Sequence, residues 1–182
     1  MTLPGLTPPA PEEYASFYAG YVAGVAGADV AALLERQPAA LREACAGLSD
    51  EGARFRYAPG KWSIKEVVGH LCDVERVFSY RALRIGRGDA TPLPGFDENA
   101  YAAAAGADDR PLEELLDEFV AVRASTLALL AGFGPEAWTR TGNANGHPMS
   151  LRAQVHVVAG HVRHHLRLLG ERYGLPAPGE RA

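Results

Sequence analysis

The sequence predicts an all-α protein, a four-helix bundle, on three observations. Alanine, leucine, valine, glutamate and arginine dominate the composition. No alternating apolar and polar pattern is long enough to indicate a β-strand. Several long segments carry apolar residues at helical spacing, and clusters of glycine and proline separate them. Four long helices without strands favour a bundle that packs around one core.

The first helical block is expected over residues 11–48, after an extended lead-in at residues 1–11 that holds four prolines. Glycines and an N-cap signal at Asp29 fall together between residues 24 and 29. We therefore expect this block to divide into two segments.

The second helix is expected over residues 63–87. Ser63, followed three residues later by Glu66, forms a capping-box pattern at its start. The next connection, residues 88–110, is too long for a tight antiparallel turn. We expect it to cross the bundle, so that the third helix, residues 111–131, runs parallel to the second. Pro111 would be the first residue of that third helix.

The fourth helix is expected over residues 150–173, with Ser150 as its N-cap and a loop at residues 141–148 before it. These elements form a single expected domain over residues 12–176. Residues 177–182 are expected to be a C-terminal tail.

Composition and charge exclude several classes of protein. The chain has 182 residues and a net charge of −4, and its basic residues are scattered, which argues against a nucleic-acid partner. No export signal is visible, and no apolar run approaches the roughly 20 residues needed to cross a bilayer. Cys45 and Cys72 are isolated from each other, which predicts reduced thiols and a cytoplasmic protein without membrane partners.

The histidines of the fourth helix divide into two pairs on a helical wheel of about 100° per residue. His165 lies in or beside the apolar stripe and His161 at its edge, whereas His156 and His164 lie on the far side. Two imidazoles one turn apart can chelate a divalent ion. The spacing alone also fits one core histidine and one surface histidine.

The second helix offers a third ligand in His70, on the flank of its apolar stripe, although His70 could also be half exposed. Asp73 could orient His70 or be a solvated charge. Glu75 and Arg81 fall inside the apolar arc, where they would form a buried ion pair or line a pocket. His147, in the loop, is expected at the surface.

Three separated motifs resemble the DinB-like (damage-inducible protein) superfamily, and its bacillithiol-transferase-like branch most closely. They are PGKWSIKEVVGHLCDVER at residues 59–76, PGFDE at residues 94–98 and AGHVRHH at residues 159–165. The likeness spans roughly residues 12–174, and the motifs agree with the family in order and spacing.

The resemblance implies an up-down-down-up four-helix bundle with a long crossover between the second and third helices. It also implies a divalent metal ion (zinc, nickel or manganese) held by His70, His161 and His165. By the same motifs Trp62 is expected to be a packing residue, and Asp97 to line the mouth of the site.

Three neutral protein ligands would leave the ion an open coordination position, which suits chemistry on a bound water, thiol or substrate. A metal-bound thiol is deprotonated near neutral pH and is a nucleophile. Together with the resemblance, this gives the first hypothesis: a transferase that joins a bacillithiol-like small thiol to electrophiles in stress or detoxification. The alternatives are a metal-dependent amide or ester hydrolase and a non-catalytic metal-binding stress protein. A homodimer is also expected.

Overall fold

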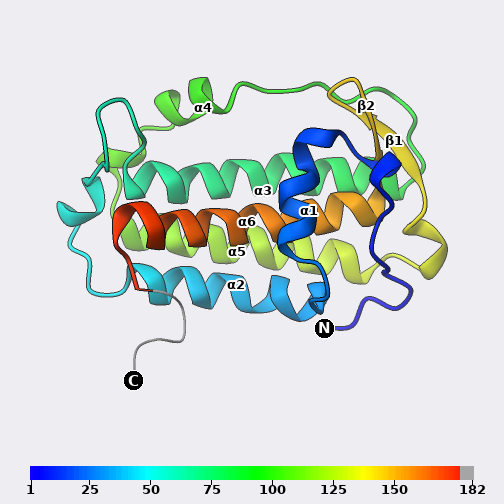
Figure 1. Cartoon of the computed structure of the whole chain (residues 1–182), viewed down its shortest axis with the longest axis horizontal. Coiled ribbons are helices and arrows are strands. Elements are labelled where there is room, and N and C mark those ends of the chain that lie inside the picture. Colours follow the sequence, from blue (N-terminus) through cyan, green and yellow to red (C-terminus); the bar gives the residue numbers. More distant parts are fainter. Residues whose placement is uncertain (177–182) are drawn as a thin grey trace.

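Four long helices form the bundle in the computed structural model, which describes residues 1–176 (Figure 1). They are α2 (Val30–Cys45), α3 (Ile64–Gly86), α5 (Leu112–Ala131) and α6 (Leu151–Tyr173). The colours of Figure 1 show that α2 and α6 run in one direction and that α3 and α5 run in the other. The predicted up-down-down-up bundle is therefore confirmed. The tail predicted at residues 177–182 lies outside the described residues.

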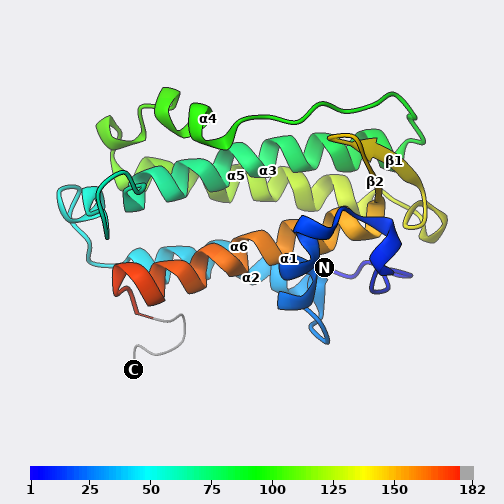
Figure 2. The ribbon, with the colours of Figure 1, turned by 45° about the horizontal axis from the view of Figure 1, so that its top comes forward.

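The crossover between α3 and α5 returns along the whole length of the bundle (Figures 1 and 2). Because the chain is carried back to the end where α3 began, α5 starts there and runs parallel to α3. The crossover contains a short helix that the sequence analysis did not predict, α4 (Glu98–Ala104). The Asp97 carboxylate caps α4 by accepting hydrogen bonds from the backbone N–H groups of Asn99 and Ala100, both at 3.0 Å.

Side-chain caps at the helix starts agree with those predicted. The Ser63 hydroxyl accepts from the Glu66 N–H at 3.0 Å, and the Glu66 carboxylate accepts from the Ser63 N–H at 2.7 Å, which completes the capping box of α3. Asp29 caps α2, and Ser150 caps α6. Pro111 is the N-cap of α5 rather than its first helical residue, a shift of one position.

A short helix, α1 (Ala19–Gly24), lies across α6 on the outside of the bundle (Figure 1). The first block is thus divided near residues 24–29, as predicted. The contact between α1 and α6 is close at Gly160, where a Cβ atom would lie 2.1 Å from the Tyr21 carbonyl oxygen. Only glycine therefore allows α1 to approach α6 at the position before His161.

A β-hairpin stands where a loop was predicted, so the prediction of a chain without strands was wrong here. Strand β1 (Thr141–Ala144) pairs antiparallel with β2 (His147–Ser150). Asn145 and Gly146, with φ of 54° and 80°, form the turn, and an Asn-Gly pair favours this left-handed geometry. A parallel bridge between Leu93 and Ala144 joins the crossover to the hairpin.

Apolar side chains fill the space between the helices, and both cysteines are buried as free thiols, as predicted. Within residues 1–176, no helix combines the length and the apolar character that crossing a membrane requires.

Candidate metal centre

Three imidazoles meet inside the bundle, one from α3 and two from successive turns of α6. His161 Nε2 lies 3.1 Å from His70 Nε2 and 3.2 Å from His165 Nε2. The candidate ligand atoms of all three residues lie within 4.8 Å of one another. The side chains are buried, with exposed fractions of 4%, 5% and 6% for His70, His161 and His165. The structure thus brings together the three histidines that the sequence analysis selected.

Burial keeps these imidazoles neutral. It lowers the pKa of His70 to about 4, because a protonated ring would lose its hydration. Burial also holds the pKa of His161 and His165 well below the ordinary value, and the neighbouring histidines lower both further by charge repulsion. At neutral pH each ring therefore has a nitrogen lone pair available to a metal ion.

The geometry of the cluster fits a divalent ion. Two nitrogens that each bind a tetrahedral zinc at about 2.0–2.1 Å lie about 3.3 Å apart, close to the two distances from His161 Nε2. Without an ion, His161 Nε2 faces two other ring nitrogens, and because it carries either one proton or one lone pair it can pair well with only one of them. The buried Nδ1 of His165 has no hydrogen-bond partner within residues 1–176, so no described residue orients that ring.

Aromatic rings surround the cluster. The ring centroid of Trp62 lies 4.6 Å from that of His70, and those of Tyr21 and Phe78 lie 5.4 Å and 5.8 Å from His161. Trp62 therefore packs as expected, and the three rings shield the imidazoles from water.

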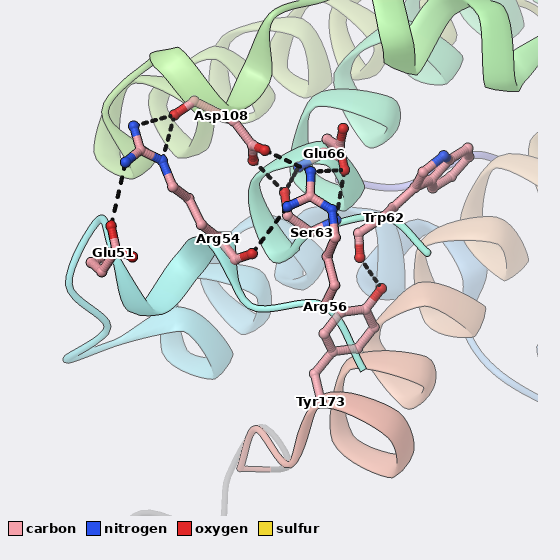
Figure 3. A network of polar contacts seen from close by, with 8 residues as sticks. All are labelled: Glu51, Arg54, Arg56, Trp62, Ser63, Glu66, Asp108 and Tyr173. Carbon is pink, nitrogen blue, oxygen red and sulfur yellow. Dashed lines mark hydrogen bonds and ion pairs between the residues drawn. The ribbon is translucent and has the colours of Figure 1, made fainter. Parts of the chain in front are cut away.

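A polar network near the start of α3 holds Trp62 in place (Figure 3). The Tyr173 hydroxyl donates to the Trp62 carbonyl oxygen at 2.8 Å. The next residue, Ser63, donates from its hydroxyl to the Asp108 carboxylate at 2.6 Å, and Arg56 bridges Asp108 and Glu66. The end of α6 and the crossover are thus both joined to the segment that carries Trp62.

A pocket of about 330 Å³ reaches His161 from the side of α1 and the crossover. Aromatic rings make up much of its wall, and its polar side chains include Tyr18, Tyr21, Arg81, Glu98 and Asn145. Sequence reasoning missed most of these residues, because they come from four separate segments that only the fold brings together. Arg81 was the exception, since a charge inside an apolar helix stripe is a visible signal.

The two carboxylates suggested near the site do not contact the imidazoles. Asp73 is half-buried, and burial raises the pKa of its carboxyl group, but in the described part of the chain it forms no hydrogen bond with His70. The Asp97 carboxylate caps α4. A role for either residue in the site stays a prediction.

Glu75 and Arg81 were expected to form a buried ion pair or to line a pocket. Arg81 lines the pocket, but Glu75 forms its buried ion pair with Arg123 of α5. The Glu75 carboxylate accepts from Arg123 Nε at 2.7 Å and from Nη2 at 2.9 Å. Arg123 Nη1 also donates to the Leu34 carbonyl oxygen and the Gln37 side-chain oxygen. Glu75 and Arg81 are six residues apart, so they point about 120° apart around α3 and face different neighbours.

The other histidines and both cysteines do not belong to the cluster of His70, His161 and His165. His156 is buried although the wheel places it away from the core stripe, and its Nδ1–H donates to the Arg152 carbonyl oxygen at 2.8 Å. His147 is exposed, as expected. Burial raises the pKa of the Cys45 and Cys72 thiols to about 12, so neither is a nucleophile at neutral pH.

Comparison with known proteins identifies relatives of the chain. The profile of the DinB superfamily matches residues 33–169. A protein of Geobacillus thermodenitrificans (strain NG80-2), named "Putative metal-dependent hydrolase", is 35% identical over 98 residues, which are 53% of this chain and 55% of that protein. A protein with the same description from Geobacillus kaustophilus (strain HTA426) is 30% identical over 130 residues, which are 70% of this chain and 73% of the relative. The match to the first relative thus spans little more than half of its length.

A solved structure shares the fold. YfiT from Bacillus subtilis, described as "a probable metal-dependent hydrolase with an unusual four-helix bundle topology", superposes with a TM-score of 0.71. The match covers 81% of this chain and 87% of YfiT at 22% sequence identity, a level at which the likeness supports the fold alone.

Proposed function

This chain belongs to the DinB superfamily, and on that basis we propose that it is a metal-dependent hydrolase of small esters or amides. One observation carries the proposal: three buried, neutral imidazoles converge inside the bundle, and one of them, His161, lines a pocket of about 330 Å³. The names of the two Geobacillus relatives support the hydrolase reading, and the histidine cluster indicates a divalent metal ion.

His70, His161 and His165 would hold the ion. A divalent ion with three imidazole ligands keeps coordination positions open, where it lowers the pKa of water and polarises a carbonyl group. Neutral ligands leave the charge of the ion uncompensated, which strengthens both effects. The aromatic rings that pack against His70 and His161 limit the access of bulk water to the imidazoles.

Glu98 supplies a carboxylate to the same pocket as His161. We assign it as the proton acceptor: its carboxylate takes a proton from the attacking water and returns it to the leaving oxygen or nitrogen as the acyl bond breaks. Removing a general base of this kind lowers kcat by about 10²-fold or more. The Glu98→Gln variant should therefore bind the ion normally and lose most of its turnover.

The test uses p-nitrophenyl acetate with protein that has been stripped of metal and reloaded with zinc, nickel or manganese. We expect hydrolysis by the loaded protein and none above background by the stripped protein or by His165→Ala. His164→Ala is the matched control, because His164 lies next to His165 in sequence but outside the cluster. If loaded wild type and His165→Ala hydrolyse esters and amides at the same rate, the proposal fails.

A second candidate is the thiol S-transferase, and one observation favours it. In the described part of the chain no carboxylate forms a hydrogen bond with an imidazole of the cluster, and a thiol needs a weaker base than water does. In this reaction a small thiolate of the bacillithiol type attacks an electrophilic carbon, the S–C bond forms and the leaving group departs. Both thiols of the protein are buried, so the attacking sulfur would be that of a cosubstrate.

The two candidates separate in one assay. With the loaded protein, a transferase converts 1-chloro-2,4-dinitrobenzene only when a thiol is added, forming the S–C bond as chloride leaves, whereas a hydrolase cleaves p-nitrophenyl acetate without added thiol. A protein that shows neither activity with any of the three metals would be left with the third reading, a non-catalytic metal-binding protein. The expected homodimer stays a prediction, and light scattering of the purified protein tests it.

A further inference from the structure

We propose that Arg81 is a carboxylate-binding residue, so that the pocket beside the histidines selects small substrates that carry a carboxylate group. The inference deepens the proposed function and rests on it, because it names the substrate class of the same pocket. It is carried by a buried guanidinium that lines the pocket and has no acidic partner within residues 1–176.

Arg81 is buried with few hydrogen-bond partners. It is 2% exposed, yet it forms only two hydrogen bonds within residues 1–176. Nη1 donates to the Tyr18 hydroxyl at 3.3 Å, and Nη2 donates to the Pro94 carbonyl oxygen at 2.8 Å. A guanidinium has five N–H donors, so several remain available to a ligand. Burying a positive charge in this way is costly unless an anion compensates it.

A second buried arginine, Arg123, shows how the protein compensates a buried positive charge. Arg123 contacts the Glu75 carboxylate through two nitrogens and donates to two further oxygens. The fold therefore supplies a carboxylate to one buried guanidinium and none, among the described residues, to the other. Arg81 differs from Arg123 in a second way, since it lines a pocket that a ligand can enter.

The surroundings of Arg81 suit a flat organic acid. The planar fork of a guanidinium matches the two oxygens of a carboxylate. The centroids of the Phe78 and Phe96 rings lie 5.7 Å and 6.0 Å from the guanidinium carbon, so both rings form cation–π contacts with Arg81 while also lining the pocket. These contacts use the face of the guanidinium and leave its N–H groups to an oxygen ligand. The Tyr18 hydroxyl accepts from Arg81 and keeps its own proton to donate to the ligand.

Glu98 lines the same pocket but does not neutralise Arg81. It lies in the exposed first turn of α4 and forms no ion pair with Arg81. Water screens the charge of the exposed Glu98 carboxylate, whereas Arg81 is buried. His161 also lines the pocket, so a substrate held by its carboxylate at Arg81 could present a second group to the metal centre.

The first experiment measures binding to the metal-free protein by calorimetry, with benzoate as the probe and neutral benzamide as its isostere. We expect wild type to bind benzoate and not benzamide, and Arg81→Gln to bind benzoate about tenfold or more weakly, because hydrogen bonds to charged groups are strong. Arg81→Lys keeps the charge and loses the fork, so its affinity should lie between the two. The matched control is Arg87→Gln, which removes the same charge from the end of α3 outside the pocket.

Three results would overturn the inference: equal benzoate affinity in wild type and Arg81→Gln, equal binding of benzamide, or tighter binding of inorganic phosphate than of benzoate. Circular dichroism checks that each variant is folded. If Arg81→Gln does not fold, the comparison of benzoate with benzamide on wild type and on Arg81→Lys still decides the question.

A second experiment separates this inference from the proposed function. The loaded protein is given phenyl acetate and 4-acetoxybenzoate, which differ by one carboxylate. We expect a KM for 4-acetoxybenzoate about tenfold lower in wild type, and a ratio near one in Arg81→Gln. Turnover of both esters with the same KM sinks the inference and leaves the hydrolase standing. Arg81-dependent benzoate binding without any ester turnover supports the carboxylate site and sinks the hydrolase.

Discussion

Two buried polar clusters lie along α3, and they differ in how completely the protein satisfies them. In the first, Glu75, Arg123 and Gln37 form a closed network that ends on the Ala159 carbonyl oxygen, which Gln37 contacts at 2.6 Å. In the second, which we call the open cluster, His161 Nε2 faces two other ring nitrogens and can pair with only one of them, and Arg81 has no acidic partner within residues 1–176.

The difference separates a structural role from a functional one. A buried polar group that finds all its partners inside the protein fixes how the helices pack. A buried polar group without partners destabilises the fold and is retained where a ligand completes it. By this criterion the first cluster joins α3, α5, α2 and α6, and the second is the site at which we propose that metal and substrate bind.

The largest effect is expected from breaking the closed cluster. Replacing Arg123 with Met leaves the Glu75 carboxylate buried without a counter-ion, which should lower the free energy of unfolding by about 3–5 kcal/mol. Urea denaturation measures the change. The double variant Glu75→Met/Arg123→Met should recover a large part of the loss, because no uncompensated charge remains.

Arg167→Met is the matched control. Arg167 pairs with Glu171 on the exposed surface of α6, and such a pair contributes about 0–1 kcal/mol. Should Arg123→Met cost no more than Arg167→Met, the closed cluster would not be the structural element described here.

The open cluster should make the metal-free protein sensitive to acid. Burial lowers the pKa of His70 to about 4, whereas the unfolded chain protonates near the ordinary value of 6.5. The unfolded state therefore binds more protons below pH 6.5, and stability present above that pH is lost as the pH falls toward 4. His70 alone contributes on the order of 3 kcal/mol, at about 1.4 kcal/mol per pKa unit. Urea denaturation of the stripped protein at several pH values tests this.

Glu13 gives a control in a different pH window. Its hydrogen bonds with Arg152 lower the pKa of its carboxyl group from 4.5 to about 2, so its contribution is lost only below pH 4.5. Glu13→Gln should leave the change between pH 6.5 and 4.5 intact, whereas His70→Gln should reduce it without abolishing it, because the pKa values of His161 and His165 are lowered as well. A stability that is constant across that range in the stripped wild type would contradict the prediction.

Filling the open cluster should stabilise the protein. Zinc at about 100 times its Kd should add about 2.7 kcal/mol to the free energy of unfolding, and chelation should remove the gain. His165→Ala should lose this gain, and His164→Ala should keep it. Thermal unfolding with and without zinc provides the measurement, and an equal zinc-induced shift in His165→Ala would exclude that residue as a ligand.

The smallest effect concerns the helix that covers the open cluster. In Gly160→Ala the new methyl group would collide with the Tyr21 carbonyl oxygen, so α1 must move away from α6. We expect a loss of about 1–3 kcal/mol and weaker metal binding, because Tyr21 packs against His161.

Gly170→Ala, on the same helix, provides the comparison for Gly160→Ala. The nearest atom to its Cβ would be 3.6 Å away, and the change should stabilise α6 by up to about 1 kcal/mol. If both variants behave alike, the close contact at Gly160 has no energetic consequence.

Local signals in the sequence were sufficient to predict the long helices and two of the three histidines of the candidate site. The capping residues Asp29, Ser63 and Ser150 mark helix starts because a cap depends only on neighbours along the chain. The wheel selected His161 and His165 for the same reason, since one helix fixes their relative direction. His70 needed the family resemblance as well, because its distance from α6 depends on how the helices pack.

The remaining features depend on contacts between distant segments. The carboxylate of Glu75 meets a guanidinium 48 residues away, and nothing near Glu75 in sequence indicates which arginine that is. The pocket combines residues of α1, α3, the crossover and the hairpin. The hairpin itself carried a local signal in Asn145-Gly146, which the strong helical pattern around it outweighed.

The spacing of the three histidines along the chain sets the order in which the centre can form during translation. His70 leaves the ribosome well before His161, which is 91 residues further on, and the candidate centre is incomplete until α6 adds its two imidazoles. A nascent chain that has completed α3 holds a single imidazole and cannot retain an ion firmly. If the cluster binds an ion as proposed, all three ligands are available to it only after α6 has been synthesised and has docked against α3.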